Sequence, residues 1–99
     1  LDMYLGIPSI LLDKDTNRRS LYGNAGSFRF QPWGVEYRVL SSYFMSSNET
    51  ISFCYNQISK AIDAYENQQK MIASEEVFEV INNNNETLAN QLINKFNLL

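Results

Sequence analysis

The sequence has no histidine and only one cysteine among its 99 residues. Without histidine, the chain cannot carry out serine–histidine or cysteine–histidine catalysis, and it lacks the usual zinc ligand. The single cysteine, Cys54, excludes an internal disulfide. Because Cys54 lies within an apolar helical pattern, we interpret it as a core residue rather than as a catalytic thiol.

Positive charge and long apolar runs are also scarce. Eight lysines and arginines stand against eleven acids, and the formal net charge of -3 argues against a nucleic-acid-binding protein. No run of 18 apolar residues occurs, so no membrane span is predicted, and no secretory signal is visible. We therefore expect a cytoplasmic protein. The chain opens on Leu1 within an apolar run, and we expect it to continue upstream as part of a longer protein.

The positive charges that do occur are unevenly placed. All four arginines fall within a span of 21 residues, whereas every lysine lies outside that span. Planar guanidinium groups bind phosphate and carboxylate well, so this cluster predicts a small anionic ligand. The cluster consists of Arg18, Arg19, Arg29 and Arg38.

The first third of the chain combines a helical segment with a glycine-rich loop. Residues 1–12 follow a helical stripe of apolar side chains, which Gly6 and Pro8 are expected to kink or divide. Residues 13–34 show no regular period, yet they hold three of the four glycines and several aromatic side chains. We interpret them as an ordered functional loop, with a second short strand at 28–30 as an open alternative.

Residues 35–41 alternate in the manner of a β-strand. Val35 and Tyr37 are expected on one side, and Glu36 and Arg38 on the other, roughly 6.8 Å apart along the strand. Such a strand either exposes a solvated charge pair or lines a polar site. The arginine-rich loop that precedes it favours the polar site.

The rest of the chain is predicted to be helical. Three helices are indicated at about 48–70, 74–81 and 86–96, and a run of four asparagines separates the last two. Ser47 or Asn48 is expected to cap the first of them. We interpret their apolar stripes as core or helix–helix contacts. The members are Ile51, Cys54, Tyr55, Ile58, Ala61, Ile62, Tyr65, Val77, Phe78, Ile81, Leu88, Leu92, Ile93 and Phe96.

The loop and the strand together hold the elements of a phosphate site. Gly23 and Gly26 would let backbone amides approach an anion, and the arginines would neutralise a polyphosphate. Glu36 would offer Mg²⁺ a carboxylate beside substrate phosphates. A phosphate-binding loop of the type G-x-x-x-x-G-K-[ST] does not occur in the sequence.

The run RRSLYGNAGSFRFQPWGVEYRVLSSYF, from Arg18 to Phe44, resembles the signature of the phage-type carboxylate–amine ligases (amidoligases, COOH-NH2 ligase type 2). This family is a branch of the glutamine synthetase and glutamate–cysteine ligase superfamily. The shared pattern is two arginines, Leu-Tyr-Gly, Ala-Gly, Phe-Arg, and then Gly-Val-Glu-Tyr-Arg and Leu-Ser. With the upstream segment, the resemblance covers about residues 2–44.

The resemblance implies an α+β fold, namely the C-terminal part of a glutamine synthetase-like antiparallel-sheet domain, with one or two strands and three to four helices. Residues 1–46 would end the catalytic core, and residues 47–99 would form a helical segment of the same domain. The implied enzyme uses ATP and Mg²⁺ to phosphorylate a carboxylate and then joins the acyl phosphate to an amine. The chain alone would be inactive, because other metal ligands and most of the nucleotide pocket would lie upstream.

The resemblance also implies a role for each residue of the motif. By position, Glu36 would bind the Mg²⁺ ion that bridges the phosphates of ATP. Arg38 would bind the substrate carboxylate or the transferring phosphoryl group, and Arg29 would stabilise the same charge. The residues implied to contact the ATP phosphates or to shape that loop are Arg18, Arg19, Tyr22, Gly23 and Gly26.

The sequence departs from the family pattern at several positions. Phe30 and Gln31 stand where Pro-Lys is expected, and Trp33 stands where tyrosine is usual. Ser42 and Phe44 replace an expected Asn and Trp. These changes bear on the choice of substrate more than on the phosphate chemistry.

Two alternatives to an active ligase stay open. One is an inactive relative that keeps the loop and binds a carboxylated peptide without turnover. The other is a helical interaction module whose arginines form structural ion pairs with Asp13, Asp15 or Glu36. The ligase predicts that Arg29, Glu36 and Arg38 surround one cavity, whereas the structural module predicts that they scatter.

Overall fold

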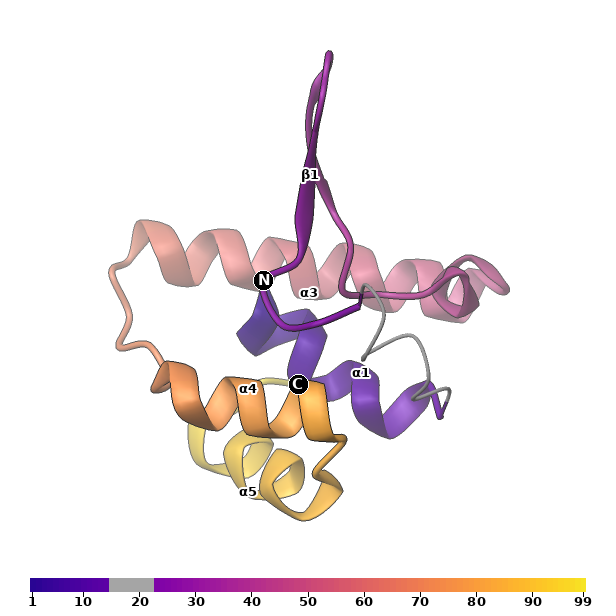
Figure 1. Cartoon of the computed structure of the whole chain (residues 1–99). Helices are drawn as coiled ribbons and strands as arrows, with labels where there is room; N and C mark the ends of the chain where they lie inside the picture. Colours follow the sequence, from indigo (N-terminus) through magenta and orange to yellow (C-terminus); the bar gives the residue numbers. More distant parts are fainter. Residues whose placement is uncertain (15–22) are drawn as a thin grey trace.

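The computed structural model describes residues 1–14 and 23–99, and over these residues the chain is an α+β protein. Figure 1 shows the helices gathered into one body, from which a β-hairpin projects. The predicted fold class is confirmed, with four α-helices and two antiparallel strands in the described part. The element order is η1 (Asp2–Gly6), α1 (Ile7–Leu12), β1 (Phe28–Gln31), β2 (Gly34–Tyr37), η2 (Ser42–Met45), α3 (Asn48–Glu66), α4 (Ser74–Asn83) and α5 (Glu86–Phe96).

The N-terminal segment forms the centre of the body. Its backbone changes from the π-helix η1 to the α-helix α1 at Gly6, where the sequence predicts a kink or a division. A Cβ atom at Gly6 would lie 2.5 Å from Cδ1 of Ile81, so glycine allows α4 to pack directly against the backbone of η1. The buried core around this contact is formed by Met3, Tyr4, Ile7, Ile10, Val39, Ile72, Val77, Val80, Ile81, Ala89, Leu92, Ile93 and Leu98.

The corner between α4 and α5 is formed by Asn84 and Asn85, whereas Asn82 and Asn83, which the sequence predicted to be part of the break, still belong to α4. Asn84 ends α4 in the left-handed conformation, with φ of 54°, which asparagine tolerates better than most residues. Asn85 then caps α5, because its side chain accepts a hydrogen bond of 3.0 Å from the backbone N–H of Leu88. The apolar stripes of these two helices are largely inside, as expected: Val77, Ile81, Leu92 and Ile93 are buried, whereas Phe78 is exposed.

The long helix α3 has a well-defined start. The Ser47 hydroxyl accepts a hydrogen bond of 3.2 Å from the Thr50 N–H, and the Thr50 hydroxyl accepts one of 3.3 Å from the Ser47 N–H. This reciprocal capping box satisfies two backbone donors at the start of the helix. The helix ends at Glu66 and not near residue 70, because Gln68 takes a left-handed conformation with φ of 53°.

A buried glutamine fastens α3 to the body. The side-chain amide of Gln57 donates hydrogen bonds to the backbone oxygens of Tyr4, at 2.8 Å, and Leu98, at 2.6 Å. The body therefore covers the side of α3 that carries Gln57. The apolar stripe of α3 was expected to form core or helix–helix contacts, and the core interpretation is wrong for Ile51, Tyr55, Ile58, Ile62 and Tyr65, all of which are exposed.

The strands β1 and β2 form an antiparallel hairpin that pairs Arg29 with Glu36 and Phe30 with Val35. The second short strand, left open at 28–30, is therefore present. The prediction of a strand at 35–41 is wrong beyond Tyr37. Strand β2 ends there because β1, its only pairing strand in the described sheet, begins at Phe28, the register partner of Tyr37. One further backbone hydrogen bond, 2.9 Å from the Arg38 N–H to the Ser27 oxygen, follows the ladder.

The described helices include none with the length and apolar character that a membrane span needs.

Candidate functional site

The hairpin separates charged from apolar side chains. Since β-strand residues alternate between faces, the β1–β2 register places Arg29, Gln31 and Glu36 on the same face. On the other face the aromatic rings of β1 meet edge to face, with centroids 5.4 Å apart. The exposed residues of that apolar face are Phe28, Phe30 and Val35.

The polar face contains a compact cluster around the Glu36 carboxylate. Arg29 donates from Nη2 at 2.7 Å and from Nε at 3.2 Å, and both bonds end on Oε2 of Glu36. Gln31 donates from Nε2 to the same oxygen at 2.8 Å. Every hydrogen bond that Glu36 accepts from a described side chain thus ends on Oε2, and Oε1 is left for another partner.

The same contacts control the protonation of Glu36. The hydrogen bond from Gln31 lowers the pKa of the Glu36 carboxyl most, followed by the hydrogen bond from Arg29. The positive charges of Arg29 and Arg38 lower this pKa further. Glu36 is therefore a carboxylate at neutral pH, as an anion-balancing group or a metal ligand has to be.

Arg38 lies just beyond the hairpin, where its half-buried side chain acts electrostatically on Glu36. Its backbone N–H is held by the hydrogen bond to Ser27. The structure therefore brings Arg29, Glu36 and Arg38 into one neighbourhood.

The described part of the glycine-rich loop is anchored to α4. The Ala25 N–H donates to Oδ1 of Asn82 at 2.8 Å, so this amide already has a partner. Gly23 is buried, and Gly26 turns the chain with φ of 75°. The space beside Gly26 is bordered by a carboxylate oxygen of Asp2, 3.8 Å from the position of an added Cβ.

Three of the predicted phosphate-site residues, Arg18, Arg19 and Tyr22, lie outside the described residues. The same holds for Asp15, one of the acids considered as a structural partner of the arginines.

The sequence did not predict two side chains that form hydrogen bonds with hairpin residues, Gln31 and Asp2. Gln31, which we noted only as a departure from the family pattern, is a hydrogen-bond partner of Glu36. Asp2 accepts a hydrogen bond from the Tyr37 hydroxyl and so ties the base of the hairpin to η1. The hairpin register would have indicated the contact of Gln31 with Glu36. The signal for the contact of Asp2 with Tyr37 was that Asp2 is an isolated acid within the apolar segment 1–12.

The polar cluster could supply one ligand to a magnesium ion, namely the Glu36 carboxylate. Among the described residues, no group of three or more histidines, cysteines, aspartates or glutamates lies close enough to hold a metal. Magnesium in phosphoryl-transfer sites is bound by one or two carboxylates together with phosphates and water. The ionised Glu36, with Oε1 turned to no described donor, suits that mode of binding.

The cluster lies on an open surface. Three cavities border Leu1, and Arg29, Glu36 and Arg38 line none of these three, although one of the cavities reaches Gly26 and Tyr37 at the base of the hairpin. The expectation that the three residues surround one cavity is therefore not met by these cavities. The three residues do not scatter either.

Cys54 is half-buried on α3, and burial raises the pKa of its thiol. A raised pKa disfavours the nucleophilic thiolate, which argues against a catalytic thiol. The interpretation of Cys54 as a core residue is not met, because Cys54 is not among the buried core residues.

Comparison with known families agrees with the motif of the arginine-rich loop. The model of the family described as phage phiEco32-like COOH.NH2 ligase-type 2 matches residues 1–96. The match thus extends beyond the motif to the C-terminal helices. No curated protein and no solved structure matches the chain.

Proposed function

Because the chain belongs to the phage phiEco32-like COOH.NH2 ligase-type 2 family, we propose that it is part of an ATP-dependent ligase that joins a carboxylate to an amine through an acyl phosphate. The observation that carries this proposal is the cluster of Arg29, Gln31 and Glu36, with Arg38 beside it. Paired guanidinium groups on an open surface suit the recognition of phosphoryl and carboxylate oxygens.

The proposed reaction has two steps. In the first, a carboxylate oxygen attacks the γ-phosphorus of ATP, the bond to the bridging oxygen breaks, and ADP leaves with that electron pair. In the second, the amine nitrogen attacks the acyl carbon and loses a proton, and phosphate leaves. Arg29 and Arg38 stabilise the negative charge on the phosphoryl oxygens and on the bound carboxylate.

Glu36 has two roles in this proposal, one for each carboxylate oxygen. Through Oε2 it holds the Arg29 guanidinium in a fixed orientation, so that the charge is in place before the substrate binds. Through Oε1 it would contribute one ligand to Mg²⁺, and the bound ion would neutralise the negative charge of the phosphates.

The remaining motif residues are assigned to the nucleotide. Arg19, with Arg18, contacts the phosphates of ATP, and Tyr22, Gly23 and Gly26 shape the loop that approaches them. The support for these roles is the family motif.

We place the rest of the site in a further part of a glutamine synthetase-like domain. In this arrangement residues 1–46 end the catalytic core, residues 47–99 are a helical extension, and the chain alone is inactive. The exposed apolar face of the hairpin supports a further sheet partner, since an isolated two-stranded hairpin is marginally stable. The substrates are small-molecule or peptide carboxylates and amines, in the cytoplasm of a phage-infected or prophage-bearing bacterium.

The ion pair between Arg29 and Glu36 also favours a second candidate, the structural module. Both side chains are partly exposed, and exposed pairs contribute little to stability. In that case the ion pair has no catalytic role and lies on the surface of the hairpin, and the chain serves as an interaction module. The inactive relative that binds a carboxylated peptide predicts binding without turnover.

The deciding experiment measures ATP-dependent phosphate release by the full-length protein with Mg²⁺ and candidate carboxylates and amines. Release that requires both substrates, and that falls about 100-fold in Glu36→Ala, supports the ligase. The matched control is Glu75→Ala, at an exposed acid of α4, which should leave the rate unchanged. Magnesium–ATP binding without release supports the inactive relative, and no nucleotide binding at all supports the structural module.

A further inference from the structure

The apolar face of α3 is wider than the part that the body covers. The body covers the side that carries Phe53, Gln57 and Ala64, which are buried or half-buried. Beside them runs a stripe of exposed apolar side chains that, at 3.6 residues per turn, spans about 80° of the helix circumference. We name this set the α3 stripe; it consists of Ile51, Tyr55, Ile58, Ile62 and Tyr65.

The α3 stripe has the spacing of a helix-pairing surface. Ile51, Ile58 and Tyr65 recur at intervals of seven residues, and so do Tyr55 and Ile62. A seven-residue apolar repeat keeps one seam of a helix facing a second helix along its length. The repeat therefore points to a helix as the partner of this surface.

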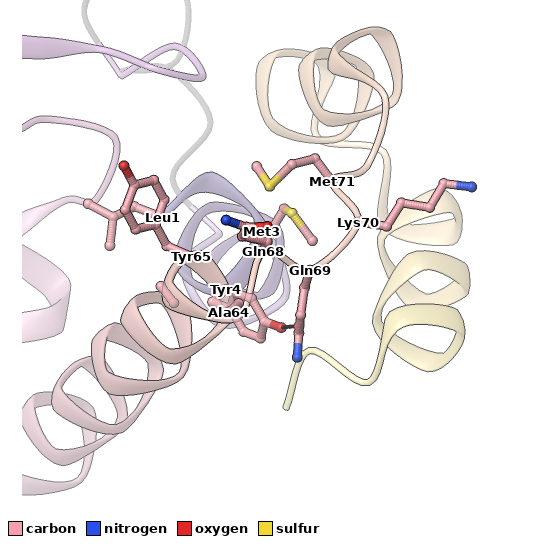
Figure 2. Close-up of a pocket in the computed structure, with 10 residues that line it drawn as sticks. Leu1, Met3, Tyr4, Ala64, Tyr65, Gln68, Gln69, Lys70 and Met71 are labelled. Atoms are coloured by element: carbon pink, nitrogen blue, oxygen red, sulfur yellow. Dashed lines mark hydrogen bonds between the residues drawn. The ribbon is translucent and has the colours of Figure 1, made fainter.

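The surface beside the stripe is hollowed where a partner's side chains would insert. A cavity of about 440 Å³ is lined by Leu1, Ile58, Ala61, Ile62, Tyr65 and Glu66. A neighbouring cavity of about 380 Å³ shares Leu1 and Tyr65 with it and extends to Met71 (Figure 2). Knobs on a facing helix need such depressions between side chains.

The exposed area is large enough for a dimer. Tyr55 and Tyr65 are 73% and 85% exposed, and at ~150–250 Å² for each ring they alone offer ~300 Å². Together with the isoleucines, Leu1 and Met71, the patch is on the order of 500 Å². Two such patches bury about 1,000 Å², which is the size at which a specific interface begins.

α3 has acids at both ends, but Glu49 in its first turn lies on the side away from the α3 stripe, so the helix dipole favours an antiparallel arrangement. Asp63 and Glu66 lie in its last turn, which contains no basic residue. An antiparallel pair centred on Ile58 places Glu66 beside residue 50 of the second copy, near the positive end of that helix. A parallel pair would instead bring the acidic ends of both helices together.

From these observations we propose that the chain forms a two-fold homodimer in which α3 pairs antiparallel with α3 of a second copy through the α3 stripe. Among the described helices, α3 is the one that exposes an apolar repeat of this kind, so the second copy carries the matching surface. An interface in which the same patch meets itself closes at two copies. The proposal is independent of the ligase chemistry.

Light scattering coupled to size-exclusion chromatography tests the proposal over a wide range of concentrations. We expect the full-length protein to have twice the mass of its own chain, and Ile58→Glu to have the mass of one chain with unchanged helical content by circular dichroism. The matched control Phe78→Glu, at an exposed apolar residue of α4, should stay dimeric. A monomer at all concentrations, open-ended assemblies, or a dimer that survives Ile58→Glu would overturn the proposal.

A cysteine placed on the two-fold axis gives a second readout that does not depend on the folding of Ile58→Glu. In a Cys54→Ser background, Ile58→Cys should form a disulfide-linked dimer on mild oxidation. Asn56→Cys, on the opposite side of α3, should not. Equal cross-linking at both positions would contradict the antiparallel arrangement.

Discussion

Arg29 and Glu36 are register partners across the β1–β2 hairpin, with Nη2 of Arg29 2.7 Å from Oε2 of Glu36. The backbone ladder fixes their spacing, and the side chains lock each other's orientation. In a phosphoryl-transfer site, such an arginine does not have to reorient as charge develops. The pair therefore links the local geometry of the hairpin to the proposed chemistry.

The first prediction concerns the shape of the Arg29 side chain. Arg29→Ala should lower kcat/KM for phosphate release by about 100-fold, and Arg29→Lys by about 10-fold, because lysine keeps the charge but loses the planar fork. Steady-state kinetics of the full-length protein measures both. Lys60→Ala, at an exposed cation on α3, is the control. Equal activity of Arg29→Ala and the parent protein would show that Arg29 does not take part in catalysis.

The second prediction concerns the titration of Glu36. Its pKa is lowered in the folded chain, so its contribution to stability is present above the ordinary glutamate pKa and is lost as the pH falls through the lowered value. Gln31→Ala should raise this pKa, because the Gln31 hydrogen bond is the main cause of the shift. Nuclear magnetic resonance of the side-chain carboxyl carbon measures the change. Gln91→Ala, at a remote exposed glutamine of α5, should leave it unaltered.

The third prediction concerns the close contact at Gly6. Gly6→Ala should destabilise the chain by about 1–3 kcal/mol, because the new methyl group overlaps with the fully buried Ile81 side chain. The gain in helix propensity, about 0.5–1 kcal/mol, is smaller. Urea denaturation provides the measurement. In an Ile81→Val background, which lacks the Cδ1 atom, the same substitution should cost less; equal costs in both backgrounds would refute the steric explanation.

The fourth prediction concerns the buried amide of Gln57. Gln57→Leu should lower the free energy of unfolding by about 2–4 kcal/mol, because the Tyr4 and Leu98 carbonyls lose their donor inside the body. Thermal or urea denaturation measures the loss. The neighbouring exposed residue provides the control, since Asn56→Leu should change stability by no more than about 0.5 kcal/mol. Similar losses in both variants would show that the buried bonds are unimportant.

Helix positions in the C-terminal half follow from local signals. Ser47 with Thr50, and Asn84 with Asn85, use short-range hydrogen bonds and backbone preferences that the sequence alone contains. The predicted start of the helix at Ser74 and the bounds 86–96 match the structure for that reason. The end of α3 was missed because a left-handed glutamine at position 68 has no strong sequence signal.

For the candidate site, the sequence identifies the residue types and the structure decides their partners. The spacing of Glu36 and Arg38 on one strand suggested that these two residues act together. The hairpin register instead gives Glu36 its direct contacts with Arg29, seven residues before it, and Gln31, five residues before it. Register depends on the turn at Pro32 and Trp33, where one extra residue would move every side chain to the other face.

The sequence by itself determined the α+β class, the family motif and the apolar periodicity of α3, because each is a local pattern along the chain. Only the tertiary structure decided that η1 and α1 form the core and that α4 closes on Gly6. It also decided that Gln57, rather than the α3 stripe, faces the body. The physical reason is that periodicity shows which side of a helix avoids water, whereas packing among distant segments determines which part of that side is covered.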